Sequence, residues 1–200
     1  MTVQKVDLEI KRAAQLSITE IGLGSLGHGF KIPLTGQLLS LNQLAFLLNA
    51  VNRDKLSNAS VFEISGIAAV LKSFSPAGQK LGPMLSICMQ GFLFWTGTVV
   101  FGANFLGQSL GAVLLCLWAF VQPALTLLMI YGTDFLKVGD YYLKRLNEDY
   151  SFLATSLLYA VSSLVLVKLA IALWMVFYSF TRKQEINLIG ENRFSELISR

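Results

Sequence analysis

The 200-residue chain is 54% hydrophobic and only 14% charged, and its mean hydropathy is +0.59. Soluble domains carry roughly 25% charged residues, so this composition excludes an ordinary soluble domain and indicates an integral membrane protein. The net charge of +4 comes from basic residues scattered singly over predicted loops and ends, which excludes a nucleic-acid-binding face. We therefore expect an all-α, polytopic membrane protein whose first partner is the lipid bilayer.

The length accommodates a bundle of about six transmembrane helices, because each span needs roughly 20 apolar residues. We expect a cytoplasmic leader over residues 1–11, a membrane domain over 12–180 and a cytoplasmic tail over 181–200. The N-terminus has mixed charge and no small-residue cleavage site, so no removable signal peptide is expected. The distribution of Lys and Arg predicts that both termini lie in the cytoplasm, and we expect a multi-pass protein of a bacterial inner membrane.

The first predicted span, residues 12–30, is the least apolar because it contains Glu20 and several glycines. The second span covers residues 33–51 and carries polar side chains among its leucines. Three of these fall on one side at helical spacing, so we expect an inward-facing polar stripe. Its members are Gln37, Ser40 and Gln43.

The connection between these two spans is rich in glycine. Glycine allows close backbone approach and positive φ, and proline ends one helix before the next begins. The segment suits a flexible lid, although an ordinary helix hairpin with a glycine-rich bend explains it equally well. The predicted lid residues are Gly24, Gly27, Gly29, Pro33 and Gly36, and the same segment contains two candidate ligand contacts, His28 and Lys31.

The remaining predicted spans are residues 58–74, 81–103, 105–131 and 150–180. Glycines in the fourth and fifth spans predict tight helix contacts, and Pro123 should kink the fifth span and free a backbone carbonyl. Residues 133–149 form an amphipathic pattern that predicts an interfacial helix with tyrosine anchors. Under the predicted topology, this stretch shares one outer face with the glycine-rich connection and the loop at residues 75–80.

Charged and polar side chains inside the spans are costly, at roughly 2.5–3.5 kcal/mol for a charge at a helix centre. They must find partners or water. Lys168 suggests two alternatives, a buried ion pair with Glu20 or Glu63, or contact with an anionic ligand. The ion pair is the commoner way to tolerate a buried charge.

Recognisable catalytic patterns are missing from the sequence. It has one histidine, no paired acids at fixed spacing, and no nucleophile-elbow, zinc-binding or phosphate-loop motif. Cys88 and Cys116 lie in apolar runs without a CxxC pattern, which indicates packing rather than metal binding. We therefore expect neither enzymatic activity nor a cofactor or metal site.

The hairpin reads Gly-Ser-Leu-Gly-His-Gly-Phe-Lys-Ile-Pro-Leu-Thr-Gly-Gln-Leu-Leu-Ser-Leu-Asn-Gln, within a compact six-span pattern that has a charged segment before its last helix. In these features the chain resembles the substrate-binding S components of energy-coupling factor vitamin transporters. The resemblance implies that residues 24–36 close over a small molecule near the outer face. It also implies docking to a transmembrane coupling subunit driven by two ATPases. The implied pocket positions are Gln90, Asn104, Gln122, Tyr131 and Lys168.

The sequence departs from that family in its docking motif. The family usually carries Ala-x-x-x-Ala, whereas the nearest equivalents here are Ala13-x-x-x-Ser17 and Ser25-x-x-x-Gly29. The resemblance as a whole leads us to expect a membrane component that takes up a small vitamin-like solute with power from partner subunits. The alternative is a non-transporting scaffold or assembly subunit, whose polar residues lie in dry pairs instead of lining a hydrated pocket.

Overall fold

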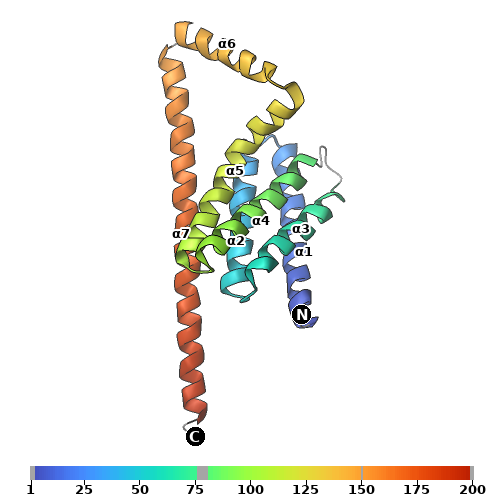
Figure 1. The fold of residues 1–200 in the computed structure, drawn as a ribbon, viewed down its shortest axis with the longest axis vertical. Coiled ribbons are helices and arrows are strands. Elements are labelled where there is room, and N and C mark those ends of the chain that lie inside the picture. Colours follow the sequence, from blue (N-terminus) through green and yellow to red (C-terminus); the bar gives the residue numbers. More distant parts are fainter. Residues whose placement is uncertain (1–2, 76–80, 150, 199–200) are drawn as a thin grey trace.

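The computed structural model describes residues 3–75, 81–149 and 151–198, and within these ranges all regular secondary structure is helical (Figure 1). Seven helices follow one another with short connections in the described ranges. They are α1 (Val3–Gly29), α2 (Thr35–Asn52), α3 (Asn58–Lys72), α4 (Leu81–Phe101), α5 (Phe105–Tyr131), α6 (Asp134–Asp149) and α7 (Ser151–Ile198). The all-α prediction is confirmed.

Three helices are long and apolar enough to cross a membrane. They are α4, α5 and residues 155–183 of α7, which have mean hydropathies of 1.5, 2.2 and 2.2. Helices α1, α2 and α3 occupy three further predicted spans, but they do not reach the same combination of length and apolarity. The expected count of six spans is therefore not confirmed, because charged and polar residues interrupt α1 and α2 and because α3 has only 15 residues.

The first and last helices extend into the predicted leader and tail. Helix α1 begins at Val3, inside the expected leader, and α7 continues past the expected end of the last span at residue 180 to Ile198. Neither boundary contains a proline or a glycine turn that would stop a helix. The predicted leader and tail are thus largely continuations of the first and last helices.

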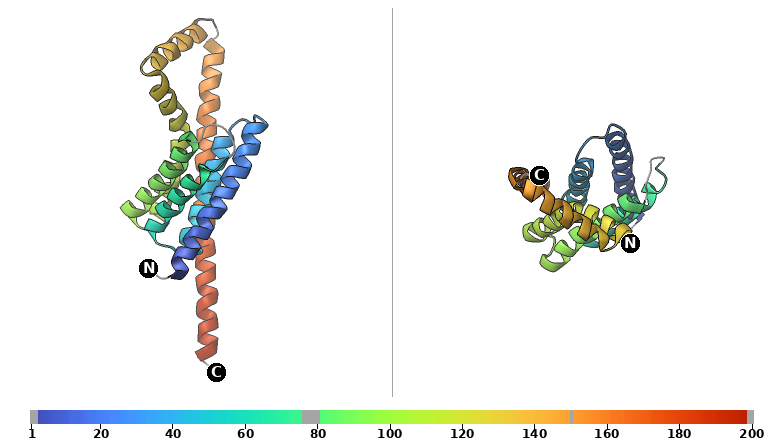
Figure 2. Two further views of the ribbon diagram at one scale, coloured as in Figure 1. Left: turned by 90° about the vertical axis from the view of Figure 1, so that its right-hand side faces the viewer. Right: turned by 90° about the horizontal axis from the view of Figure 1, so that it is seen from above.

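Helices α1 to α5 form the packed body of the molecule, and α7 runs along it against α2 and α5 (Figures 1 and 2). The core contains large apolar side chains from six helices, with no solvent exposure for Leu16, Leu44, Leu115 or Val176. Many other large apolar residues remain exposed, including Phe30, Leu81 and Met129. A large exposed apolar surface of this kind is what a lipid-facing protein presents.

Glycines allow α4 and α5 to approach each other very closely, as predicted. A Cβ atom added at Gly97 would lie 2.3 Å from the backbone nitrogen of Gly111. One added at Gly111 would lie 2.7 Å from the carbonyl oxygen of Phe94. Asn104 caps the start of α5, since its side chain accepts a hydrogen bond from Gly107 N at 2.9 Å, and its Nδ2 donates to the carbonyl oxygen of Phe101, the last residue of α4, at 2.7 Å.

One end of the molecule holds the α1–α2 connection, the start of α4 and helix α6 (Figure 1). This arrangement agrees with the predicted grouping of the glycine-rich connection and the tyrosine-rich stretch, where Tyr141 and Tyr142 are exposed. Residues 76–80 of the predicted loop and the third anchor, Tyr150, lie outside the described residues. The α2–α3 and α4–α5 turns lie at the other end of the packed body.

Candidate functional site: a polar cavity beneath the glycine-rich hairpin

The glycine-rich segment forms a tight connection between α1 and α2. Helix α1 ends at Gly29, the Ile32 amide donates to the Gly27 carbonyl oxygen at 2.8 Å, and α2 begins at Thr35. The positive φ angles in this turn belong to Lys31 and Leu34, at 53° and 63°, rather than to its glycines. Gly27 contributes close approach instead, because a Cβ atom there would lie 2.3 Å from Thr35 Cγ2.

A cavity of about 880 Å³ lies beneath this hairpin and is lined by five helices. Ligand sites for small molecules commonly have volumes of roughly 300–1,000 Å³. The polar and charged lining residues are Glu20, Ser25, Ser40, Gln43, Lys72, Ser75, Ser86, Gln90, Gln122 and Thr126. The remainder are apolar residues, two prolines and the glycines Gly24, Gly29, Gly36 and Gly82.

Two opposite charges, Glu20 of α1 and Lys72 of α3, form part of the wall. Both residues are buried, and Lys72 Nζ donates a hydrogen bond to the backbone carbonyl oxygen of Glu20 at 2.7 Å. Gly24 makes room for this contact, because a Cβ atom there would lie 3.2 Å from Lys72 Nζ. The hydrogen bond of Lys72 goes to the backbone of Glu20. The side-chain carboxylate of Glu20 and the ammonium group of Lys72 are therefore both part of the cavity wall.

Three glutamine amides come from three other helices. Gln43 of α2 donates to the Ile87 carbonyl oxygen at 2.8 Å, Gln90 of α4 donates to Ser86 Oγ at 2.8 Å, and Gln122 of α5 donates to the Gly82 carbonyl oxygen at 2.8 Å. Each amide is therefore held by its nitrogen. This arrangement fixes the positions of the amide groups along the cavity wall.

Two polar atoms of the lining are buried without a hydrogen-bond partner among the described residues. They are Gln43 Oε1 and Ser25 Oγ. Buried polar groups are nearly always hydrogen-bonded in native proteins, and each exception needs an explanation such as water or a ligand. Both atoms belong to the cavity wall, so a polar molecule in the cavity would satisfy them.

The structure brings some of the predicted site residues to this cavity and leaves others away from it. Gln90, Gln122 and the glycines at 24, 29 and 36 line it. Pro33 and Lys31 are exposed in the turn, Asn104 caps α5 and Tyr131 is exposed at the end of α5. The side chain of His28 lies outside the described ones.

Lys168 is buried, but it is not among the lining residues, and in the described part of the chain it forms no ion pair. It donates instead to Gln37 Oε1 and to the Cys116 carbonyl oxygen, the latter at 3.2 Å, and its Nζ lies 4.8 Å from the centre of the Phe120 ring. The expected pairing with Glu20 or Glu63 is therefore not what the structure shows. Glu63 is partly buried on α3, away from the cavity lining.

Gln37 also supplies the partner that the predicted proline kink requires. Pro123 has no N–H, so the carbonyl oxygen of Ala119, one helical turn earlier, loses its helical donor. Gln37 Nε2 donates to that oxygen at 3.0 Å. Together, Lys168, Gln37 and Ala119 link α7, α2 and α5 through buried polar contacts, as a low-dielectric environment requires.

Sequence reasoning missed the role of Lys72 and of the Gln43 and Ser25 side chains as cavity groups. A signal was present for two of them: Lys72 is an intraspan charge, and Gln43 continues the predicted polar stripe of α2. That stripe is confirmed, since Ser40 and Gln43 are buried and Gln37 is partly buried. Ser25 gave no signal beyond its small size.

Replacing Gly27 with leucine should loosen the hairpin. The new side chain would overlap Thr35 at the start of α2, so the two arms must separate. We expect backbone amides over residues 24–39 to exchange with deuterium at least about tenfold faster than in the wild type. The control is Gly22→Leu, because no heavy atom lies within 4 Å of a Cβ at Gly22. Equal exchange in the two variants would show that the Gly27 contact does not hold the hairpin closed.

Comparisons with protein-family models, with curated proteins and with solved structures found no match to this chain.

Proposed function

We propose that this chain is a membrane component that binds a small polar solute in the cavity beneath the glycine-rich hairpin and takes part in its uptake. The observation that carries the proposal is that two polar atoms on the cavity wall, Gln43 Oε1 and Ser25 Oγ, have no hydrogen-bond partner among the described residues, in a space large enough for a vitamin-sized molecule. A scaffold that only locks helices together would bury its polar groups in dry pairs. Lys168 forms dry pairs of this kind with Gln37 and the Cys116 carbonyl oxygen. The cavity differs, because Gln43 Oε1 and Ser25 Oγ have no such pair among the described residues.

The lining suggests what kind of solute fits. A carboxylate, an ammonium group and three glutamine amides offer both hydrogen-bond donors and acceptors. A zwitterion or a neutral heterocycle with donors and acceptors would satisfy such a wall, whereas a simple anion would leave Glu20 unfavourably placed. Power for uptake would come from partner subunits, a transmembrane coupling protein and ATPases, because the sequence contains no phosphate-loop motif.

The test is mass spectrometry of small molecules that co-purify with the detergent-solubilised protein. We expect the wild type to retain a polar metabolite, and Glu20→Gln or Lys72→Met to retain it at least about tenfold less, the effect of one lost charge-assisted hydrogen bond. Both substitutions nearly preserve side-chain shape. They therefore remove a charge from the cavity without filling it.

Matched controls separate binding from general charge effects. Glu63→Gln removes a carboxylate from α3 that does not line the cavity, and Lys137→Met removes an exposed ammonium from α6. Both should retain the metabolite at the wild-type level. A folded wild-type protein that carries no solute, or controls that lose the solute as fully as the cavity variants, would reject the proposal in favour of a scaffold.

A further inference from the structure

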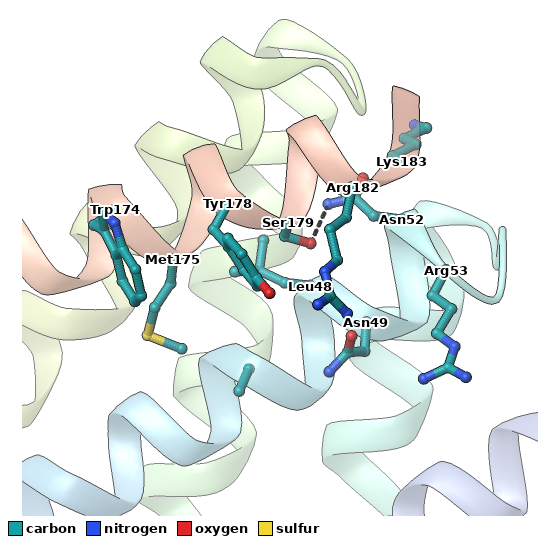
Figure 3. A pocket seen from close by; sticks show the side chains of 11 residues that line it. Leu48, Asn49, Asn52, Arg53, Trp174, Met175, Tyr178, Ser179, Arg182 and Lys183 are labelled. Atoms are coloured by element: carbon teal, nitrogen blue, oxygen red, sulfur yellow. Dashed lines mark hydrogen bonds between the residues drawn. The ribbon is translucent and has the colours of Figure 1, made fainter. Parts of the chain in front are cut away.

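A second pocket lies at the opposite end of the packed body, between the C-terminal end of α2 and α7 (Figure 3). Its volume is about 410 Å³. The residues that decide its chemistry are Asn49, Asn52, Arg53, Trp174, Tyr178 and Arg182. None of them lines the cavity beneath the hairpin, so the two sites are independent.

Buried amides fix the walls of this pocket. Asn52 Nδ2 donates to Gln108 Oε1 at 2.7 Å, and Gln108 Nε2 donates back to Asn52 Oδ1 at 2.8 Å. Asn52 also donates to Ser179 Oγ at 2.9 Å, which is the bond drawn in Figure 3. Asn52 is only 4% exposed and Gln108 is fully buried. These contacts hold α2, α5 and α7 together, so the pocket is a formed feature of the fold.

The polar side of the pocket is cationic. Arg53 and Arg182 lie on either side of Asn49 in Figure 3, and Lys183 adds a third positive charge at the edge. Among the side chains that the structure describes, no aspartate or glutamate lines the pocket and none of the three cations forms an ion pair. Asp54, the neighbour of Arg53, is already engaged by Arg12 at 2.9 Å. An anionic ligand would therefore complete this site.

Aromatic rings form the other side. Trp174 and Tyr178 stack with ring centres 5.7 Å apart, and the Arg182 guanidinium lies 5.0 Å from the centre of the Tyr178 ring. Trp174 is 63% exposed and Phe177, on the same helix, is 57% exposed. Stacking on Tyr178 orients Arg182 while leaving its N–H groups available for hydrogen bonds.

The pocket lies where the apolar stretch of α7, residues 155–183, ends in Arg182 and Lys183. Aromatic residues followed by basic ones mark the boundary between the acyl chains and the headgroups of a bilayer, and basic pockets between helices bind lipid phosphates there. We propose that this pocket binds the phosphate headgroup of an anionic phospholipid. The acyl chains would lie along the exposed apolar face of α7 beside Trp174.

The experiment uses native mass spectrometry of the full-length protein in detergent, incubated with equal amounts of dioleoyl phosphatidylglycerol and dioleoyl phosphatidylcholine. The wild type should retain one phosphatidylglycerol in preference to phosphatidylcholine. The double variant Arg53→Gln, Arg182→Gln should bind phosphatidylglycerol about thirtyfold more weakly, given two lost cations at a membrane surface. The charge-preserving variant Arg53→Lys, Arg182→Lys should recover most of the preference, which a folding defect would not allow.

The control for overall charge is the double variant Lys11→Gln, Lys55→Asn. It removes two exposed cations outside the pocket, and asparagine tolerates the positive φ of 55° at residue 55. This control should bind phosphatidylglycerol as the wild type does. A control that loses binding equally, or a wild type without lipid preference, would overturn the proposal. Displacement of the lipid by millimolar inorganic phosphate would assign the site to a free anion instead.

Discussion

Replacing Gly97 with alanine is expected to lower the free energy of unfolding by about 3 kcal/mol, the upper part of the range for overpacked cores. The added Cβ atom would lie 2.3 Å from the nitrogen and 2.5 Å from the Cα atom of Gly111, and 2.9 Å from the carbonyl oxygen of Gly107. All three neighbours are backbone atoms, so no side-chain rotation can relieve the overlap. Helices α4 and α5 must move apart, and both are candidate membrane spans.

The measurement is an unfolding titration with sodium dodecyl sulfate in detergent micelles, followed by far-ultraviolet circular dichroism. Gly66→Ala in α3 is the matched control, because no heavy atom lies within 4 Å of its Cβ position. Alanine favours a helix over glycine by roughly 0.8–1.0 kcal/mol, so this control should be neutral or slightly stabilising. If the two alanine variants unfolded alike, close packing of α4 on α5 would not limit stability.

Replacing Gln37 with leucine is expected to cost more than removing the charge of Lys168 itself. The leucine variant would leave a buried ammonium without Gln37 Oε1 and the Ala119 carbonyl oxygen without its donor, at about 3 kcal/mol together. Lys168→Met would remove the charge and take a donor from two neutral acceptors, Gln37 Oε1 and the Cys116 carbonyl oxygen, at about 1 kcal/mol. A buried charge without its partner is thus costlier than no charge.

A double-mutant cycle measures this asymmetry in the same unfolding titration. The double variant Gln37→Leu, Lys168→Met should be more stable than the sum of the single losses predicts, by about 1 kcal/mol or more, because the two residues are in direct contact. Additive losses, or a larger loss for Lys168→Met than for Gln37→Leu, would contradict the described network. The control is Asn49→Ala in the exposed part of α2, which should have little effect on the free energy of unfolding.

The two proposed sites lie at opposite ends of α2. The polar cavity lies beneath the α1–α2 connection, and the cationic pocket lies near the α2–α3 turn at the far end of the same helix. Gln37 lies within the first turn of α2, which begins at Thr35, and its contacts with α5 and α7 join the hairpin to the rest of the bundle. Movement of the hairpin would therefore act on α5 and α7 through the partly buried side chain of Gln37, whereas Asn52 joins the same helices at the far end of α2.

The sequence by itself determined the helices and several of their local features. Every helix from α2 to α6 begins and ends within a few residues of its predicted limits, because apolar runs and the breaks between them are local signals. The close glycine contacts of α4 and α5 and the inward polar stripe of α2 were predictable for the same reason. These properties depend on residues that are near one another in the chain.

The tertiary structure alone decided which buried polar groups meet. Lys168 contacts Gln37, 131 positions away, rather than a carboxylate, and Lys72 contacts the backbone of Glu20, 52 positions away. Hydropathy shows that a charge inside a span needs a partner, but it does not show which helices are neighbours or how they are rotated. Packing between segments that are distant in the chain decides which helices are neighbours. The same packing decides which polar residues line the cavity and which hold the bundle together.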